Sequence, residues 1–318
     1  MKTLDKKILN FLFSEKASDS DRKGFLLNLN RDGVTAQQIA DLVKFLLPRN
    51  FPSEKFTDAI DICGTGGSGL PRINVSTISA FILSTAGVKI AKHGNRAASG
   101  RCGSFDLLEK LGLKIEKTAD ELASNFAREN LAFIFAPMFF PPMRFFATVR
   151  GEIGVPTIFN LLGPLLNPAQ PAVQIIGTNS PENAEKICRA AKILKKKRCA
   201  VVVGENGLDE ICLSGKTLVL EFSDDSEIKK REIFPKDFGF EKLPFEKFSG
   251  GGAEENLKIA ESILRGENSP HADLVAANCA FVLHFLNRSK SLPEGVEITR
   301  EILQSKKAEK ILEKMREI

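Results

Sequence analysis

The chain has 318 residues, of which 43% are hydrophobic and 27% charged, a composition typical of a globular protein with a large core. No run of about 20 apolar residues occurs, so the sequence predicts no membrane-spanning helix, and we expect a cytoplasmic protein. The net charge is +5. Two basic runs, residues 195–198 and 229–231, lack interleaved aromatic residues, which argues against nucleic acid as the main partner.

The N-terminal region, residues 1 to about 50, carries apolar residues at helical spacing. Thr35 with Gln38 forms a capping box that predicts the start of a helix. Pro48 and Pro52 end this region. From residue 57 onwards strand-like and helix-like segments alternate, which is the pattern of an α/β sheet. Strands are expected near residues 58–62, 88–91, 131–136, 173–177 and 199–203.

The later segments complete the predicted fold. Prolines interrupt the alternation after residue 136, and a helical segment of about 141–166 is expected to leave the sheet and join the N-terminal helices. Closing helices are expected at 254–264, 272–286 and 299–315. We therefore expect an α/β fold with two domains. A small N-terminal helical domain (1–56, completed by about 141–166) would accompany a larger α/β domain (57–318) with a central, mostly parallel sheet.

A glycine-rich loop, residues 61–69, follows the first expected strand and leads through Asn74-Val-Ser-Thr77 into an apolar helix at 78–86. A strand, a glycine turn and a helix N-terminus together form an anion cradle, because backbone N–H groups and the helix dipole favour negative charge. The loop matches neither the P-loop nor the dinucleotide fingerprint. Taken alone, it is equally typical of a tight turn.

A second cradle follows the next expected strand. Residues 88–91 lead into Lys92-His-Gly-Asn-Arg96, and Ser104 opens another helix. Two phosphate-sized cradles separated by one βα unit indicate a ligand with phosphates at both ends.

These motifs together resemble the anthranilate phosphoribosyltransferase family. The similarity is carried by Gly64-Thr-Gly-Gly67, Asn74-Val-Ser-Thr77, residues 92–96, Gly103-Ser-Phe-Asp106, residues 157–168 and Gly207-Leu-Asp-Glu210, in the same order and over nearly the whole chain. The resemblance implies a nucleoside-phosphorylase-like α/β domain that binds phosphoribosyl pyrophosphate, hinged to a helical domain that forms a homodimer. It also implies transfer of phosphoribose to the amine of anthranilate, a step of tryptophan biosynthesis.

The resemblance also assigns the diphosphate site. Glycine backbone would approach the pyrophosphate, hydroxyl groups would donate hydrogen bonds, and Lys92 would act as a point charge. For Ser76, Thr77 and Ser104 the other reading is helix capping, and for Lys92 it is a solvated strand end. The implied residues are Gly64, Thr65, Gly66, Gly67, Ser68, Asn74, Ser76, Thr77, Lys92 and Ser104.

The resemblance further implies that the adjacent carboxylates Asp209 and Glu210 hold Mg²⁺, two ions per chain, together with Ser76. The other reading of the carboxylates is an acidic surface turn. Catalysis would be electrostatic, through Lys92, Asp209 and Glu210, with no covalent nucleophile, because the anomeric carbon passes through an oxocarbenium-like state and an anion leaves.

The acceptor site needs a partner for a carboxylate and an apolar slot for a ring. The resemblance implies that Arg150 is the carboxylate partner, a role that a bidentate guanidinium pair suits, and that Asn95 is the matched amide. The lining is expected to include His93, Met143, Gly163 and Pro164. The other readings are a helix-surface arginine for Arg150 and a core histidine for His93.

Three positions depart from the family pattern. Ser68 stands where relatives usually have Asp, Phe140 stands in place of a histidine at the acceptor entrance, and residues 70–73 introduce a proline and Arg72. The same sequence also fits a different aromatic acceptor, a pyrimidine nucleoside phosphorylase or a non-catalytic nucleic-acid-binding relative. Dependence on pyrophosphate rather than phosphate distinguishes the transferase from the phosphorylase.

Overall fold

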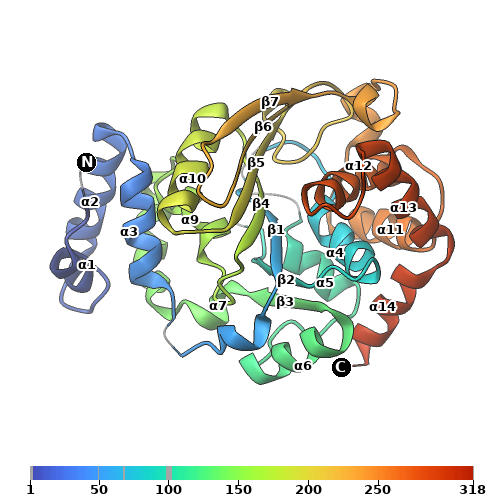
Figure 1. Cartoon of the computed structure of the whole chain (residues 1–318). Helices are drawn as coiled ribbons and strands as arrows, with labels where there is room; N and C mark the ends of the chain where they lie inside the picture. The colour runs from blue at the N-terminus through green and yellow to red at the C-terminus, as the bar shows by residue number, and fades with distance from the viewer. Residues whose placement is uncertain (1–2, 49, 67–68, 98–101, 318) are drawn as a thin grey trace.

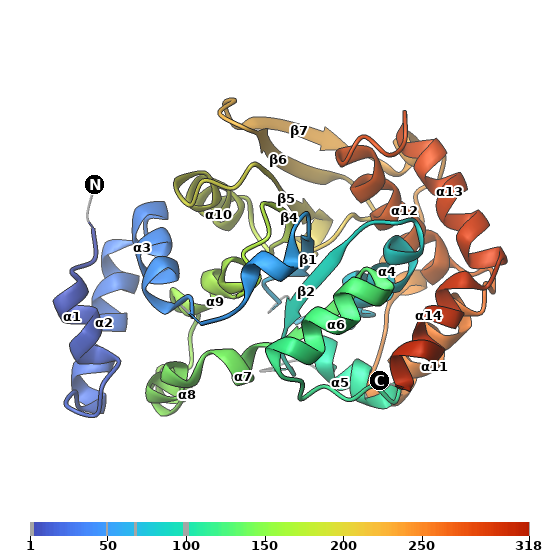
Figure 2. The same cartoon turned by 60° about the horizontal axis from the view of Figure 1, so that its bottom comes forward.

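The computed structural model describes residues 3–48, 50–66, 69–97 and 102–317. In this part of the chain seven strands form a sheet in the order β3-β2-β1-β4-β5-β6-β7 (Figures 1 and 2). The first five strands are parallel, whereas β6 and β7 are antiparallel to their neighbours. Their bounds are β1 Ile60–Gly64, β2 Ile90–Gly94, β3 Leu131–Phe135, β4 Val173–Gly177, β5 Arg198–Gly204, β6 Thr217–Ser223 and β7 Lys229–Ile233.

The α/β fold with a mostly parallel sheet is confirmed, and all five expected strands are present. The strands β6 and β7 were not predicted from the sequence. The basic run at residues 229–231 belongs to β7, whose side chains are mostly exposed at the sheet edge. Charged edge strands discourage pairing with other chains, and they carry no apolar pattern that would reveal them in a sequence.

The helices on one face of the sheet enclose the larger hydrophobic core. Alternate strand residues such as Ile62, Ile175 and Val202 face this core, as expected for strands buried on both sides. Its helices are α4 (Val75–Thr85), α5 (Ser104–Lys110), α11 (Ala253–Leu264), α12 (Pro270–Phe285), α13 (Leu292–Gln304) and α14 (Lys307–Arg316).

The single closing helix expected at 299–315 is wrong, because two helices cover this region. α13 begins at Leu292, after the N-cap Ser291, and ends at Gln304. α14 begins at Lys307, after Lys306 has adopted a left-handed conformation with φ of 55°. Apolar residues continue across the break without a glycine or proline, so the sequence pattern does not reveal it.

The opposite face of the sheet packs against a second core, to which Ile176, Val201 and Val203 contribute. This core includes α10 (Pro181–Ile193) and the N-terminal helices α1 (Lys6–Leu12), α2 (Asp19–Asp32) and α3 (Ala36–Leu46). The capping box of Thr35 and Gln38 at the start of α3 is confirmed. Figures 1 and 2 show the three N-terminal helices beside α10, away from α11–α14.

The chain between β3 and β4 also packs into the second core. It comprises α7 (Ala136–Phe139), η2 (Pro141–Phe146), α8 (Ala147–Ile153), α9 (Phe159–Leu162) and η3 (Gly163–Leu166). Phe146, Ile158 and Leu162 are buried there together with Leu9 and Leu42 from the N-terminal helices. The domain boundaries themselves stay a prediction.

A third, smaller core lies beneath α6 (Ala119–Glu129) and joins Phe56 to Phe126, with ring centroids 5.1 Å apart. Within the described residues, the helices are all too short or too polar to cross a membrane.

Candidate active site

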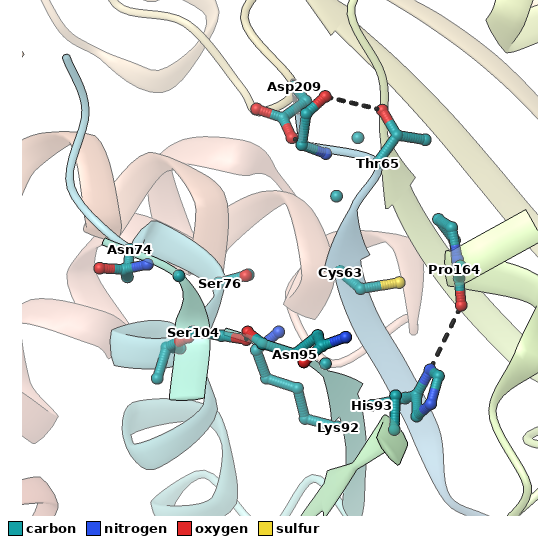
Figure 3. Close-up of a pocket in the computed structure, with 18 of the residues that line it drawn as sticks. Cys63, Thr65, Asn74, Ser76, Lys92, His93, Asn95, Ser104, Pro164 and Asp209 are labelled. Atoms are coloured by element: carbon teal, nitrogen blue, oxygen red, sulfur yellow. Dashed lines mark hydrogen bonds between the residues drawn. The ribbon is translucent and has the colours of Figure 1, made fainter. Parts of the chain in front are cut away.

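The C-terminal ends of the parallel strands open into a cavity of about 810 Å³. This edge of an open α/β sheet is the usual place for a ligand, because loops from neighbouring strands converge there. Each predicted site residue that the structure describes lines this cavity. Gly67 and Ser68 lie outside the described residues. Figure 3 shows Asp209 and Thr65 on one side of the space, and Lys92, Asn95 and Ser104 on another.

The first glycine loop leaves β1 at Gly64 and is attached to the neighbouring strand. The Thr65 amide donates to the Gly177 carbonyl at 2.9 Å, and the Thr65 and Thr178 hydroxyls lie 3.2 Å apart. Gly66 follows with φ of 68°, a conformation that favours glycine. The loop therefore presents its backbone to the cavity.

Asn74 connects the two predicted cradles. It is the N-cap residue of α4, but its side chain makes no capping hydrogen bond. Its Nδ2 instead donates to the carbonyl of Cys102 at 3.2 Å, in the segment that leads into α5. The start of α4 and the start of α5 are thereby held on the same cavity.

The predicted hydroxyl donors are not N-cap residues. The N-caps are Asn74 for α4 and Gly103 for α5, whereas Ser76 and Thr77 lie in the first turn of α4. The Thr77 Oγ1 is buried and has no hydrogen-bond partner among the described residues. The Ser104 hydroxyl donates to the Asn95 carbonyl at 3.1 Å. Helix capping therefore does not account for the first two hydroxyls.

Lys92 lies inside β2 and not at a solvated strand end, with only 2% of its surface exposed. Burial lowers the pKa of its ammonium group, and the neighbouring Cys63 and Asp61 oppose that shift. A buried ammonium facing a cavity is a strong attractant for an anion.

Asp61 is fully buried, is not part of the cavity lining, and was not predicted as a functional residue. Strands β1 and β2 pair only at Ile60 and Ile90. Farther along, the His93 amide donates to the buried Asp61 carboxylate at 3.3 Å. The side chain thus accepts a hydrogen bond where the two strands diverge.

His93 is buried, and one of its ring nitrogens has no hydrogen-bond partner in the described part of the chain. Its Nδ1 lies 3.2 Å from the carbonyl of Gly163, and the ring packs edge-on against Phe140 at 5.7 Å. Burial lowers the pKa of His93 to about 4, so the ring is neutral at neutral pH. The carbonyl then requires the proton on Nδ1, and the buried Nε2, which has no partner among the described residues, is left as an acceptor.

The other predicted acceptor residues border the same part of the cavity. Arg150, on α8, is half-buried and its guanidinium lies 5.3 Å from the centroid of the Phe159 ring. Burial lowers its pKa. Among the described residues no carboxylate forms an ion pair with it. Asn95 follows β2, and the remaining lining residues are Met143 in η2 and Gly163 and Pro164 in η3.

The carboxylate pair lies in the loop after β5. Asp209 is buried, and its Oδ2 accepts a hydrogen bond from the Gly66 amide at 3.0 Å. A Cβ at Gly64 would overlap the Asp209 carboxylate, and one at Gly177 would overlap its backbone. Two strand-end glycines therefore permit this loop to approach the sheet. This is a second reason for Gly64, beyond the predicted approach of a ligand.

Glu210 is partly buried beside Asp209. Burial raises the pKa of its carboxyl to about 7, and the Arg72 guanidinium opposes the rise. Its neighbour Ile211 is held by Asn278 of α12, which accepts from the Ile211 amide at 3.0 Å and donates to its carbonyl at 3.1 Å. A residue of the C-terminal helices thus fixes the carboxylate loop.

The side chains that line the cavity can hold magnesium only together with oxygen atoms from a bound ligand. No cluster of three or more His, Cys, Asp or Glu side chains in the described part of the chain could hold a metal. Mg²⁺ typically uses one or two carboxylates and completes its shell with water and substrate phosphates. Asp209 and Glu210 on a cavity wall match that requirement.

Two residues of the cavity have structural roles that the sequence analysis did not predict. Asn278 is a lone amide in an apolar helix, and a half-buried amide of this kind indicates a hydrogen-bond partner inside the protein. Arg72 was noted only as a departure, yet it lines the cavity and pairs with Asp209.

The chain is similar to known proteins both in sequence and in structure. Residues 56–309 match the model of the glycosyl transferase family, a/b domain. The anthranilate phosphoribosyltransferase of Persephonella marina is 39% identical over 315 residues, covering 98% of this chain and 93% of the relative. The crystal structure of the Thermus thermophilus anthranilate phosphoribosyltransferase has a TM-score of 0.89 at 35% identity, covering 99% of this chain and 96% of that one. The Saccharomyces cerevisiae enzyme in complex with PRPP and Mg has a TM-score of 0.85 at 28% identity, covering 98% and 90%.

Proposed function

Since the chain belongs to the anthranilate phosphoribosyltransferase family, we propose that it transfers phosphoribose from phosphoribosyl pyrophosphate to the amine of anthranilate, a step of tryptophan biosynthesis. One observation carries the proposal. The described residues of both phosphate cradles, the carboxylate pair and the predicted acceptor set all line one cavity.

The diphosphate end of the substrate lies against the first glycine loop and the start of α4. Backbone amides there and the positive end of the helix favour phosphate, and Thr77 offers a buried hydroxyl without another partner among the described residues. The buried Lys92 adds a fixed positive charge. Charge is thereby neutralised where the leaving group separates, while the ribose carbon gains positive character.

Asp209 and Glu210, with Ser76, are the residues that would hold magnesium, and we propose two ions per chain. When bound, the ions neutralise the leaving pyrophosphate. The protein contributes the position of the carboxylates, which the Gly66 amide and Asn278 fix.

Anthranilate occupies the other end of the cavity. Arg150 pairs with its carboxylate and Asn95 adds an amide, while Phe140, Met143 and Pro164 form the apolar walls. The free Nε2 of neutral His93 accepts a hydrogen bond from the arylamine and so orients its lone pair toward the ribose. No covalent nucleophile takes part.

We also propose that the protein forms a homodimer through the helical region, with α1 and α2 at the interface. The cytoplasmic location stays a prediction of the sequence.

The proposal is tested by following anthranilate fluorescence with phosphoribosyl pyrophosphate and Mg²⁺, against the low background of a chain without Trp or Tyr. We expect consumption that requires both, with release of pyrophosphate. The double variant Asp209→Asn with Glu210→Gln should lose about 100-fold or more of kcat/KM at every magnesium concentration.

Near-normal turnover by the double variant would show that the carboxylates are not metal ligands. Phosphate-dependent cleavage of pyrimidine nucleosides, without any consumption of anthranilate, would replace the proposed activity by that of a phosphorylase.

A further inference from the structure

Arg72 is a cation inside the diphosphate site that the family resemblance does not assign. Its guanidinium forms an ion pair with the Asp209 carboxylate, and their side chains are 26% and 3% exposed. The residue belongs to the stretch 70–73, where the sequence departs from the family pattern. An ion pair between a largely buried guanidinium and a buried carboxylate is a specific contact, which an exposed arginine on the surface does not make.

The fold holds Arg72 in place through its backbone. The Gly250 amide donates to the carbonyl of Pro71 at 3.3 Å, and a Cβ at Gly250 would lie only 2.6 Å from the Arg72 carbonyl group. Ile73, the next residue, is buried in the core with 2% exposure. The segment that carries the guanidinium is therefore packed between the loop at 249–251 and the core.

Both oxygens of Asp209 are engaged in this arrangement. Oδ1 pairs with Arg72, and Oδ2 accepts the Gly66 amide. Arg72 also faces Glu210, and no second cation pairs with either carboxylate within the described residues. A metal ion that approaches Asp209 must therefore displace the guanidinium and meets its like charge.

A bound diphosphate changes this competition between Arg72 and a metal ion for Asp209. Guanidinium groups bind phosphate oxygens bidentately, so an arriving diphosphate can take over the Arg72 contact and release Asp209. The anion then supplies oxygen ligands for the same metal that the freed carboxylate can hold.

We propose that Arg72 is a built-in counter-ion that keeps Asp209 closed to metal until a diphosphate ligand draws the guanidinium away. This inference rests on the proposed function of the cavity as a diphosphate site. It makes metal binding dependent on diphosphate binding, and it assigns Arg72 a direct contact with the diphosphate.

Two titrations of the full-length protein test the proposal, because the same variant should gain affinity for one ligand and lose affinity for the other. In the first, Mn²⁺ alone is added to substrate-free protein at about pH 8, where carboxyl groups are ordinarily ionised, and free Mn²⁺ is read by electron paramagnetic resonance. Arg72→Ser should bind Mn²⁺ about tenfold more tightly than the wild type. In the second, calorimetry follows inorganic pyrophosphate with EDTA present, and the same variant should bind about tenfold more weakly.

Matched variants distinguish the loss of the positive charge at Arg72 from a general disruption of the structure. Arg144→Ser removes an equal charge from the lining of the same cavity, but Arg144 contacts the Phe145 ring and no carboxylate among the described residues, so Mn²⁺ affinity should not change. Arg72→Lys keeps the charge and should stay close to the wild type in the Mn²⁺ titration. Arg72→Gln replaces the serine variant if circular dichroism shows that the latter is unfolded.

A folded Arg72→Ser or Arg72→Gln variant that binds Mn²⁺ no more tightly than the wild type overturns the proposal. Loss of affinity for both probes would mean that the residue only supports the structure, and this too overturns it. The Mn²⁺ titration contains neither substrate, so its outcome is independent of the anthranilate assay. If the wild type consumes anthranilate but binds Mn²⁺ as tightly as Arg72→Ser does, the proposed function stands and this inference is wrong.

Discussion

Arg150 is the residue on which we propose that recognition of the acceptor depends. It is half-buried at the cavity, stacks against Phe159 and pairs with no carboxylate among the described residues, so an incoming carboxylate can be its partner. Arg150→Ala should raise the KM for anthranilate about tenfold or more and change the KM for phosphoribosyl pyrophosphate far less. Steady-state kinetics with each substrate varied in turn gives both values.

Arg150→Lys is the control, because it keeps a charge but loses the bidentate geometry, and it should fall between the alanine variant and the wild type. Equal increases in both KM values would show that Arg150 maintains the shape of the whole cavity.

Protonation of His93 makes the stability of the folded protein depend on pH in the acidic range. Its pKa is lowered by burial from 6.5 to about 4, so between these values the unfolded chain binds more protons than the folded one. The free energy of unfolding then rises with pH through this window. The contribution is complete above 6.5, and on the order of 3 kcal/mol of it is lost on acidification to about 4.

The variant His93→Gln cannot gain a proton there, so its free energy of unfolding should depend less steeply on pH between 6.5 and 4. Urea denaturation at a series of pH values measures both proteins. Parallel curves for the two would mean that His93 titrates normally in the folded state.

At the scale of elements, two strand-end glycines determine how closely the carboxylate loop approaches the sheet. A Cβ at Gly177 would overlap the backbone of Asp209. Gly177→Ala should therefore destabilise the protein by about 1–3 kcal/mol and raise the KM for phosphoribosyl pyrophosphate more than that for anthranilate. Chemical denaturation and steady-state kinetics measure the two effects.

Gly24→Ala in α2 is the matched control, since a Cβ at Gly24 meets no atom within 4 Å. It should stabilise the protein by up to about 1 kcal/mol, because alanine favours a helix interior. If Gly177→Ala behaved like this control, the loop would be free to move away without cost.

Burial explains why most elements could be predicted, although the buried apolar strand β6 was not. The five parallel strands are short apolar runs because helices cover both faces of the sheet, and a run of this kind is visible in the sequence. The strand β7 is a charged edge, and the break between α13 and α14 depends on the conformation of Lys306. Neither leaves a local signal.

At the scale of the whole molecule, α1 and α2 carry exposed apolar side chains that suit the proposed dimer. Ile8 and Phe11 on α1 are 52% and 43% exposed, and Leu27 on α2 is 46% exposed. We predict a dimer in light scattering, and the double variant Ile8→Ser with Phe11→Ser should shift it toward monomer. Phe234→Ser, which removes an exposed ring elsewhere, should leave the mass unchanged.

A monomeric wild type at micromolar concentration would contradict the predicted dimer. A dimer that the double variant leaves intact would place the interface on another surface.

The amino-acid sequence alone was enough to predict the five parallel strands, the two glycine-containing segments that follow β1 and β2, and the order of the motifs, because these depend on residues close together in the chain. Only the tertiary structure decided that Arg72 reaches Asp209 and that Asn278 holds Ile211. These partners lie far apart in the chain, and they meet because separate loops and helices pack at one edge of the sheet. Such contacts depend on where whole elements lie, which no local pattern encodes.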